Sequence, residues 1–334
     1  MTSQLKGQLR PVPPDDGIVT NCGKALPALI EQAGANARFA YEEFFHAKIR
    51  NRHTRRAYRR AVVRFLDWCA HRNRWLQHIT PAEVGLYLDQ VPLSVASRKQ
   101  VLAALRHFFD GMVTRHAIAL NPALSVRGER YQVLEGKTPE IPIRQARRLL
   151  TSIDDGSLVG MRDKAIISIL IYTAARIGAV AQLRRRDLYD AGDQYCLHFV
   201  DKGGKSREIP VRHDLQKILR TYLQAADASG DRQRVLGDAP LFRTAQSRTG
   251  RLTERAMTDN DIARMIKRRM RACGLPTRLS PHSFRVTTIT DLLSQGVPLE
   301  DVQHLAGHAD PRTTRLYDRR HKTVTRNIVE RISV

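Results

Sequence analysis

The chain has 334 residues, with 56 lysines and arginines against 33 acidic residues, which gives a formal net charge of +23. This length is enough for two domains with substantial cores, and so large a positive excess favours a polyanionic partner. No apolar run reaches the roughly 20 residues that a membrane-spanning helix needs, and the N-terminus lacks the apolar core of a signal peptide. The four cysteines form no C-x-x-C pair, which is typical of free thiols. We therefore expect a cytoplasmic protein without a membrane partner.

The first part of the chain is predicted to be an irregular arm followed by a helical unit. Residues 1–36 contain several Pro and Gly residues and no sustained periodicity, apart from a helical turn near residues 25–32. Residues 37–126 show apolar residues at helical spacing instead. We expect this helical unit to fold as a small domain of its own.

Three helix starts are predicted inside this unit. Thr54 is placed to cap a helix that runs to about His71, and Ser94 is placed to cap a later one. Between them, Thr80 and Glu83 have the spacing of a capping box. These signals divide the unit into at least three helices.

The helix after Thr54 is predicted to have an apolar face and a basic face. Tyr58, Val62 and Phe65 recur at helical spacing, whereas four arginines lie elsewhere on the surface. Runs of charge are usually solvated surfaces, but arginines without acidic partners favour contact with phosphates. Together with basic residues on the helix after Ser94, the candidate phosphate-binding residues are Arg56, Arg59, Arg60, Arg64, Arg98, Lys99 and Arg106.

Residues 127–140 contain two glycines and a proline and are predicted to be a linker. After it, strands are predicted over 194–200 and 206–211, joined by a turn that contains Lys202 and Lys205. Residues 229–257 are expected to form a long irregular segment. The remaining periodic segments predict helices over 142–153, 161–174, 212–226 and 258–273.

The stretch from Leu279 to Tyr317 carries the residues with the most chemistry. Gly296 and Gly307 are placed to end two short helices, and Asp310-Pro311 is placed to begin a third that carries Tyr317. Three short helices in series can fold back on each other. The side chains that would then converge on one cleft are His282, Arg285, His308 and Tyr317.

Such a cluster suits phosphate chemistry. Arginine presents a planar fork of donors that matches phosphate oxygens, and a tyrosine oxygen can act as a covalent nucleophile. Histidines can donate hydrogen bonds or move protons. No cysteine or carboxylate pair accompanies them, so a metal site is poorly supported, and we expect no cofactor. Each residue taken alone would fit an ordinary helix surface or a satisfied core.

The ordered set resembles the active-site region of the tyrosine recombinases, the phage integrase family. That family combines an arginine in a T-G-x-R-x-x-E-like stretch, a hairpin lysine, H-x-x-R, a histidine or tryptophan after L-G, and a later tyrosine. Arg176, in TAARIGAVAQL, matches the first arginine, although Ala174 and Ala179 stand where the family often has glycine and an acidic residue. By spacing, Lys202 matches the lysine better than Lys205, and the L of L-G is replaced by alanine here.

The resemblance implies a fold and an activity. The fold would be mainly α with a small β-sheet: a helical core-binding (SAM-like) domain over 37–126 and an α+β catalytic domain over 141–322. The activity would be that of a site-specific DNA recombinase, which cuts and rejoins DNA through a 3′-phosphotyrosine intermediate to integrate, excise or resolve a mobile element. The implied catalytic set is Arg176, Lys202, His282, Arg285, His308 and the nucleophile Tyr317.

The implied partners are double-stranded DNA with specific recombination sites and further copies of the chain in a tetrameric synapse. Lys205 joins the candidate DNA-binding residues, and the protein would work in the bacterial cytoplasm at the nucleoid. Residues 323–334 carry apolar residues at helical spacing on a segment too short to be stable alone. We expect this tail to dock either on its own domain or on a neighbouring protomer. The sequence does not indicate accessory proteins or the DNA target.

Two other classes of protein remain open at this stage. A type IB topoisomerase uses the same bond chemistry to relax DNA, but the small N-terminal helical domain and the short tail favour a recombinase. A DNA-binding regulator would need only the basic helices, and the complete set of nucleophile and cations argues against it.

Overall fold

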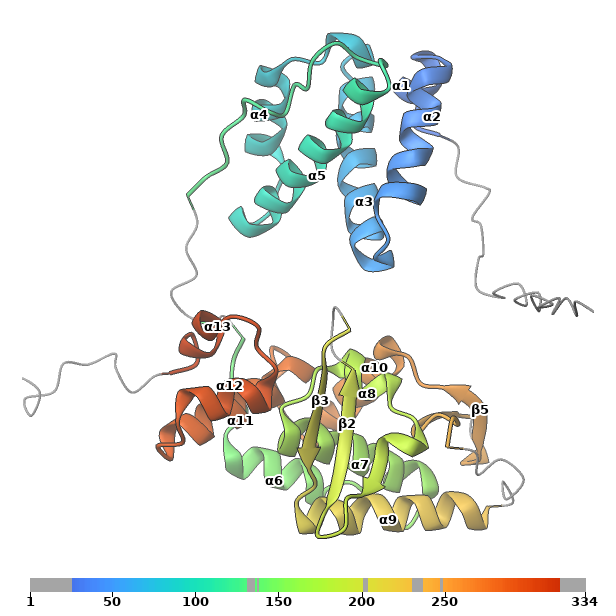
Figure 1. The fold of residues 1–334 in the computed structure, drawn as a ribbon, viewed down its shortest axis with the longest axis vertical. Helices are drawn as coiled ribbons and strands as arrows, with labels where there is room; N and C mark the ends of the chain where they lie inside the picture. Colours follow the sequence, from blue (N-terminus) through green and yellow to red (C-terminus); the bar gives the residue numbers. More distant parts are fainter. Residues whose placement is uncertain are drawn as a thin grey trace, which may run out of the picture. The chain divides into compact units, whose positions relative to one another are not determined.

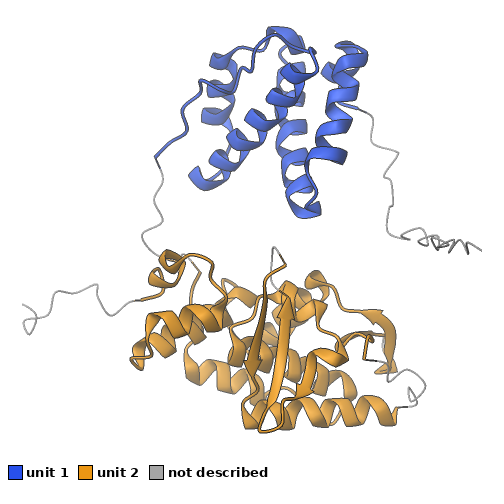
Figure 2. Cartoon of the chain, in the orientation of Figure 1, with its two compact units in different colours: residues 1–132 blue, residues 133–334 orange. Residues whose placement is uncertain are grey.

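The computed structural model describes residues 26–130, 136, 138–200, 204–229, 237–246 and 249–318. The chain forms two compact units, residues 1–132 and 133–334 (Figure 2). Both units are mainly helical, and the strands lie in the second one (Figure 1).

Unit 1 is a bundle of helices. Their bounds are α1 (Ala28–Gln32), α2 (Ala35–Glu43), α3 (Arg52–Ala70), α4 (Pro81–Gln90) and α5 (Val95–Thr114), with a π-helical turn at Phe44–Lys48 and a 3₁₀ turn at Leu76–His78. The capping box at Thr80 and Glu83 and the cap at Ser94 are confirmed. The predicted cap at Thr54 is wrong, because α3 begins at Arg52 and the Asn51 side chain accepts from the backbone N–H groups of His53 and Thr54.

The core of unit 1 is rich in aromatic side chains. Phe44, Phe45 and Phe108 are fully buried, and Phe44 meets the other two rings edge to face, with ring centroids 4.9 and 5.6 Å apart. Leu29 and Ile30 of α1 are buried in the same core. The helical turn predicted near residues 25–32 is therefore present as α1, whereas the irregular arm predicted over 1–36 extends too far, since α2 starts at Ala35. The residues before 26 lie outside the described part of the chain.

Unit 2 combines helices with two small sheets. Its helices are α6 (Ile143–Thr151), α7 (Leu158–Thr173), α8 (Ile177–Gln182), α9 (His213–Ala228), α10 (Asp259–Ala272), α11 (Pro281–Ser294), α12 (Leu299–Ala306) and α13 (Pro311–Arg315). Strands β1 (Leu188–Asp190), β2 (Tyr195–Val200) and β3 (Ser206–Pro210) form an antiparallel sheet in that order. Strands β4 (Arg243–Ala245) and β5 (Leu252–Ala256) form a second pair.

The predicted helices and the β2–β3 hairpin are present in the structure within a few residues of their expected bounds. Two expectations about unit 2 were wrong. The region predicted to be irregular over 229–257 contains β4 and β5, whose three and five residues are too short to give a clear alternating pattern. Tyr317 was expected on the last helix, but α13 ends at Arg315 and Tyr317 lies in the turn that follows.

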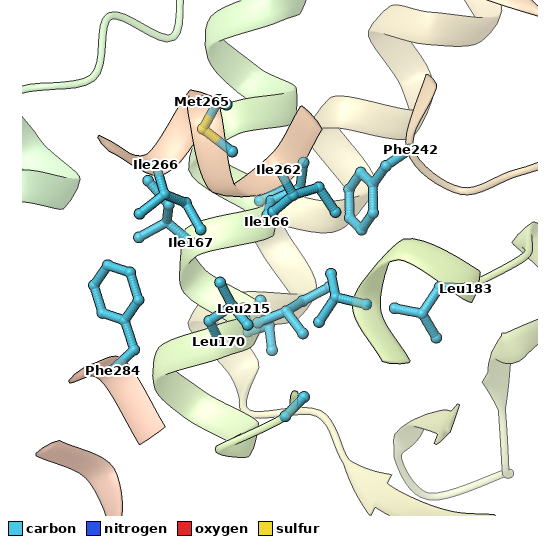
Figure 3. Close-up of a cluster of buried hydrophobic side chains, with 14 of the residues drawn as sticks. Ile166, Ile167, Leu170, Leu183, Leu215, Phe242, Ile262, Met265, Ile266 and Phe284 are labelled. Atoms are coloured by element: carbon cyan, nitrogen blue, oxygen red, sulfur yellow. The ribbon is translucent and has the colours of Figure 1, made fainter. Parts of the chain in front are cut away.

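Helix α7 lies at the centre of unit 2, and most of its residues are buried. Ile166, Ile167 and Leu170 of α7 pack in a cluster with side chains from α9, α10 and α11, including Leu215, Ile262 and Phe284 (Figure 3). A mostly aliphatic run such as residues 165–171 suits a central helix, because most of its surface packs against other helices. This packing fixes where α7 ends, and α7 ends beside the candidate site.

A buried ion cluster ties α7 to α10. Asp163 is fully buried on α7, and its carboxylate accepts from the Arg162 side chain and from Arg269 Nε of α10 at 2.9 Å. A buried carboxylate needs such partners, since leaving one charge unpaired would cost several kcal/mol. The basic face of α10 is therefore partly structural.

Helix α7 ends in a left-handed residue. Ala174 has φ +50°, a conformation that costs a residue with a Cβ roughly 1–2 kcal/mol. Its side chain is fully buried in a cluster with Val286 and Ile289 of α11. The turn at Ala174 sends the chain into α8 within three residues, so Arg176 is placed at the start of α8.

This turn can be tested by changing Ala174. We expect Ala174→Gly to leave stability within about 1 kcal/mol. Relief of the strained turn is offset by loss of a buried methyl, worth about 0.8 kcal/mol, and by the entropy of glycine. Ala174→Val should destabilise by about 2 kcal/mol or more, because branching at Cβ adds to the strain. Thermal unfolding followed by circular dichroism would measure both, and equal melting of the two variants would contradict the assignment.

Candidate active site

Five of the predicted catalytic residues come from four neighbouring segments of unit 2. Arg176 precedes α8, His282 and Arg285 lie in the first turns of α11, His308 follows α12, and Tyr317 follows α13. Their proximity is recorded in direct contacts and in shared electrostatic influence on the two histidines. The three-helix series predicted from the glycine and proline positions therefore does fold back on itself.

Each of the two arginines is held by the backbone of another site segment. Arg285 is 2% exposed, and its Nη1 donates to the carbonyl oxygen of Ala174 at the end of α7. Arg176 donates from both Nη atoms to the carbonyl oxygen of Gly307, at 3.4 Å each. Gly307 adopts φ +62° and ends α12. Unsatisfied carbonyls at helix ends attract cations, so the two turns position both guanidinium groups.

The candidate nucleophile lies between the two histidines. The hydroxyl oxygen of Tyr317 is 3.3 Å from His282 Nε2. On its other side, the ring of Tyr317 stacks on the ring of His308, with centroids 5.7 Å apart and an interplanar angle of 11°. The Tyr317 side chain is 8% exposed. A proton on its hydroxyl therefore has a nitrogen acceptor close by.

Both histidines are biased toward the neutral form. Burial and the charges of Arg285 and Arg176 lower the pKa of His308 from its ordinary 6.5 to about 3. The pKa of His282 is also lowered, mainly by partial desolvation and to a smaller extent by the charges of the same two guanidinium groups. A neutral His282 can accept a proton from Tyr317, and a neutral His308 can donate from only one ring nitrogen.

The sequence did not reveal Arg207, which also belongs to this region. It lies on β3, its Nη1 donates to the carbonyl oxygen of Leu305 near the end of α12, and its guanidinium lies 5.1 Å from the centroid of the Phe199 ring. Its charge is among those that lower the pKa of His308. In SREIPV it reads as an ordinary strand residue, and only the packing of the hairpin against α12 shows its role.

The remaining positions are placed as follows. Lys202 lies outside the described residues, and Lys205 is exposed just before β3. Ala179, where the resemblance led us to look for an acidic residue, is buried on α8. Asp187 caps a short turn by accepting from the backbone N–H of Arg184, 2.7 Å away. Among the described residues, no group of three His, Cys, Asp or Glu side chains could hold a metal ion.

The basic residues of unit 1 divide into two groups. Arg56, Arg60 and Arg64 are exposed along α3 at intervals of four residues, and Lys99 is exposed on α5. Arg60 and Arg64 line a shallow groove with Ser97 and Gln100 of α5. These positions are open to a ligand.

The other three arginines of unit 1 make contacts within the protein. Arg59 lies over the ring of Phe45, 5.0 Å from its centroid. Arg98 pairs with Glu129 at 2.6 Å, and Arg106 donates to the carbonyl oxygens of Ala123 and Val126. A lone sequence cannot separate the two groups, because the partners lie up to 31 residues away.

Two guanidinium groups, two histidines biased toward the neutral form and a buried tyrosine are side chains that phosphoryl transfer by a tyrosine nucleophile would use. Residues 141–323, more than half of the chain, match the family model of the phage integrase family, and residues 40–116 match that of the phage integrase N-terminal SAM-like domain. The chain belongs to the phage integrase family. It is a tyrosine-type site-specific recombinase, an enzyme that cleaves and rejoins DNA, and its mainly α fold with SAM-like and catalytic domains is confirmed.

Individual relatives are more distant. Tyrosine recombinase XerC of Rhodospirillum centenum is 29% identical over 287 residues, which cover 81% of this chain and 79% of the relative. Tyrosine recombinase XerD of Ralstonia nicotianae is 26% identical over 80% of this chain and 83% of its own. The structure of XerH bound to a palindromic difH substrate superimposes with a TM-score of 0.64 at 17% identity, covering 86% of this chain and 82% of XerH. The Tn1549 transposon integrase gives 0.61 at 17% identity, covering 90% and 97%.

The burial of His308 predicts a pH dependence of stability. Because its pKa is lowered in the folded chain, the unfolded chain binds this proton first as the pH falls. The stabilisation is complete above pH 6.5 and is lost between pH 6.5 and about 3. We expect the free energy of unfolding of His308→Gln to fall less steeply over this range, by up to about 1.4 kcal/mol per pH unit.

Urea unfolding at several pH values, followed by circular dichroism, would measure this difference. His304→Gln is the matched control, since His304 is exposed on α12, the helix that His308 follows. The protein has two tryptophans, Trp68 and Trp75, and both lie in unit 1. Their fluorescence should therefore follow the unfolding of unit 1, which we expect to be the same in every variant because the substitutions are in unit 2. Parallel slopes for the wild type and His308→Gln would show that this imidazole is not held neutral.

Proposed function

We propose that this recombinase acts on double-stranded DNA with specific recombination sites, and that Tyr317 forms a 3′-phosphotyrosine bond with one strand. The observation that supports this most directly is the 3.3 Å contact of the Tyr317 hydroxyl with His282 Nε2, beside two arginines anchored by backbone carbonyls. The structures of XerH with difH and of lambda integrase with a COC′ core site contain DNA, and the fold is shared with them.

Cleavage in this proposal is an in-line displacement at phosphorus. The Tyr317 oxygen bonds to the phosphorus and its proton passes to His282 Nε2. Arg176 and Arg285 bind the non-bridging oxygens and stabilise the charge that builds up on them, and His308 donates a further hydrogen bond. The bond from phosphorus to the 5′ oxygen breaks, and that oxygen takes a proton from a general acid. The resemblance assigns this role to Lys202, with Lys205 as the alternative.

Rejoining reverses these steps with a 5′ hydroxyl from a partner strand. The phosphotyrosine bond retains the energy of the phosphodiester that was cut, so the proposed reaction requires neither ATP nor a metal ion. We further propose that four protomers assemble on paired sites, and that the tail at 323–334, which lies outside the described residues, docks on its own or a neighbouring protomer. The setting would be the nucleoid in the bacterial cytoplasm. No helix among the described residues is long and apolar enough to cross a membrane.

The biological role that we propose is integration, excision or resolution of a mobile element. The Tn1549 transposon integrase supports it through its similar fold. Tyrosine recombinases XerC and XerD are among the proteins similar in sequence, and they favour recombination between chromosomal sites as the second candidate.

The proposal predicts a covalent adduct that depends on one oxygen atom. Tyr317→Phe should abolish an SDS-resistant complex with nicked DNA while affinity stays within a few fold, because the arginines remain. An adduct that persists in this variant would show that another residue is the nucleophile. Joined products between two duplexes would support a recombinase, whereas relaxation of supercoiled DNA without joining would favour a topoisomerase. DNA binding without any wild-type adduct would favour a regulator.

A second prediction concerns phosphate contacts by unit 1. The logarithm of affinity should fall with the logarithm of salt concentration by about 0.9 for each phosphate neutralised. We expect Arg60→Ala with Arg64→Ala to flatten this slope by up to about two, because both side chains are exposed in one groove. Arg115→Ala is the control, since that guanidinium is already paired with Glu43. An unchanged slope in the double variant would exclude these two arginines from the DNA interface.

A further inference from the structure

Thr314 of α13 touches both a candidate catalytic histidine and the segment of the nucleophile. It is fully buried, and its Oγ1 lies 2.9 Å from His308 Nδ1. Its carbonyl oxygen accepts the backbone N–H of Tyr317 at 3.0 Å. One residue therefore holds the imidazole through its side chain and the nucleophile through its backbone.

The direction of the hydrogen bond follows from the surroundings of Thr314. A buried hydroxyl must donate its hydrogen to an acceptor, and in the described part of the chain His308 Nδ1 is the partner of this hydroxyl. If Nδ1 carried the ring proton, it would donate to Oγ1, and the threonine hydrogen would be left without an acceptor. The favoured arrangement has Thr314 donating to an unprotonated Nδ1.

The consequence lies at the opposite nitrogen of the ring. A neutral imidazole carries one ring proton, so an unprotonated Nδ1 places that proton on Nε2. The charges that act on His308 include those of the cations Arg285, Arg176 and Arg207. An anionic oxygen bound among these cations would accept a hydrogen bond from Nε2–H of His308, rather than face a lone pair on Nε2.

We propose that Thr314 is a positioning residue that fixes the Nε2–H tautomer of His308, so that Nε2 donates to a non-bridging oxygen of the scissile phosphate. This inference rests on the proposed function. The opposite tautomer would direct a lone pair at a negatively charged oxygen and weaken its stabilisation in the transition state. Because Gln303 also holds the backbone of His308, with 3.1 Å contacts in both directions, the ring has little freedom to compensate by moving.

The link to Tyr317 makes the effect specific to the chemical step. The imidazole stacks on the phenol ring, and the turn that presents Tyr317 is closed by the Thr314 carbonyl. Losing only the hydroxyl leaves that turn and the stacking intact. DNA binding should then be preserved, while the rate of phosphotyrosine formation falls.

The first experiment compares Thr314→Val, which keeps the shape and removes the hydroxyl, with Thr314→Ser, which keeps the hydroxyl. In single-turnover assays on saturating nicked DNA, the valine variant should form adduct about 10- to 100-fold more slowly, as expected when a group that assists one transition-state contact is lost. Half-site affinity should stay within a few fold. The serine variant should recover most of the rate. A valine variant as fast as the wild type would overturn the proposal.

A double-mutant cycle separates positioning from a general structural role. In a His308→Phe background there is no tautomer to fix, so adding Thr314→Val should slow the reaction no further. If the two losses multiply instead, Thr314 does not act through His308. The melting temperatures of all four proteins are measured alongside, because a structural role would lower them together with the rate.

A measurement on the wild type needs neither a variant nor catalysis. Nitrogen-15 NMR of the full chain with labelled histidine, assigned by the loss of one signal pair in His308→Phe, reads the protonation of each ring nitrogen. The proposal requires the shift of an unprotonated nitrogen at Nδ1 and of a protonated one at Nε2. The reverse pattern would refute it even if the valine variant fails to fold. Since this readout requires no cleavage, it also separates failure of this inference from failure of the proposed function.

Discussion

The site depends on two backbone carbonyls, each belonging to a residue in the left-handed conformation that ends an α-helix. The carbonyl of Ala174, at the end of α7, holds Arg285, and the carbonyl of Gly307, at the end of α12, holds Arg176. Each turn also sits within two residues of another site residue, since Arg176 follows Ala174 and His308 follows Gly307. The arginines are therefore positioned by the same turns that place their neighbours, and a shift at one helix end would move the whole cluster.

Rigid packing behind these turns gives them their precision. Helix α7 is surrounded by α9, α10 and α11, so its last residue cannot move without disturbing a close-packed core. Arg207 adds a second support by joining β3 to the carbonyl of Leu305 at the end of α12. A phosphate-binding site benefits from such preorganisation, because donors already in place need not reorganise when charge develops.

The electrostatics of the cluster act on both histidines in the same direction. Cationic neighbours and burial lower the pKa of both, which keeps His282 available as a proton acceptor and leaves His308 with a single N–H. A bound phosphate would bring negative charge among the arginines and oppose this shift. Protonation of the two histidines is therefore expected to be coupled to the presence of DNA, with the free site biased against extra positive charge.

The sequence by itself determined the family, the identities of the converging residues and most helices of unit 2. Those conclusions rest on local signals, since H-x-x-R spacing, helix-ending glycines and the proline after Asp310 act within a few residues of themselves. The tertiary structure alone decided the contacts between distant segments. It separated the exposed Arg60 from the internally bonded Arg106, identified Arg207 and Thr314, and placed Tyr317 in a turn rather than on a helix. The physical reason is that a hydrogen bond across many residues depends on how helices pack, which no local pattern in one sequence records.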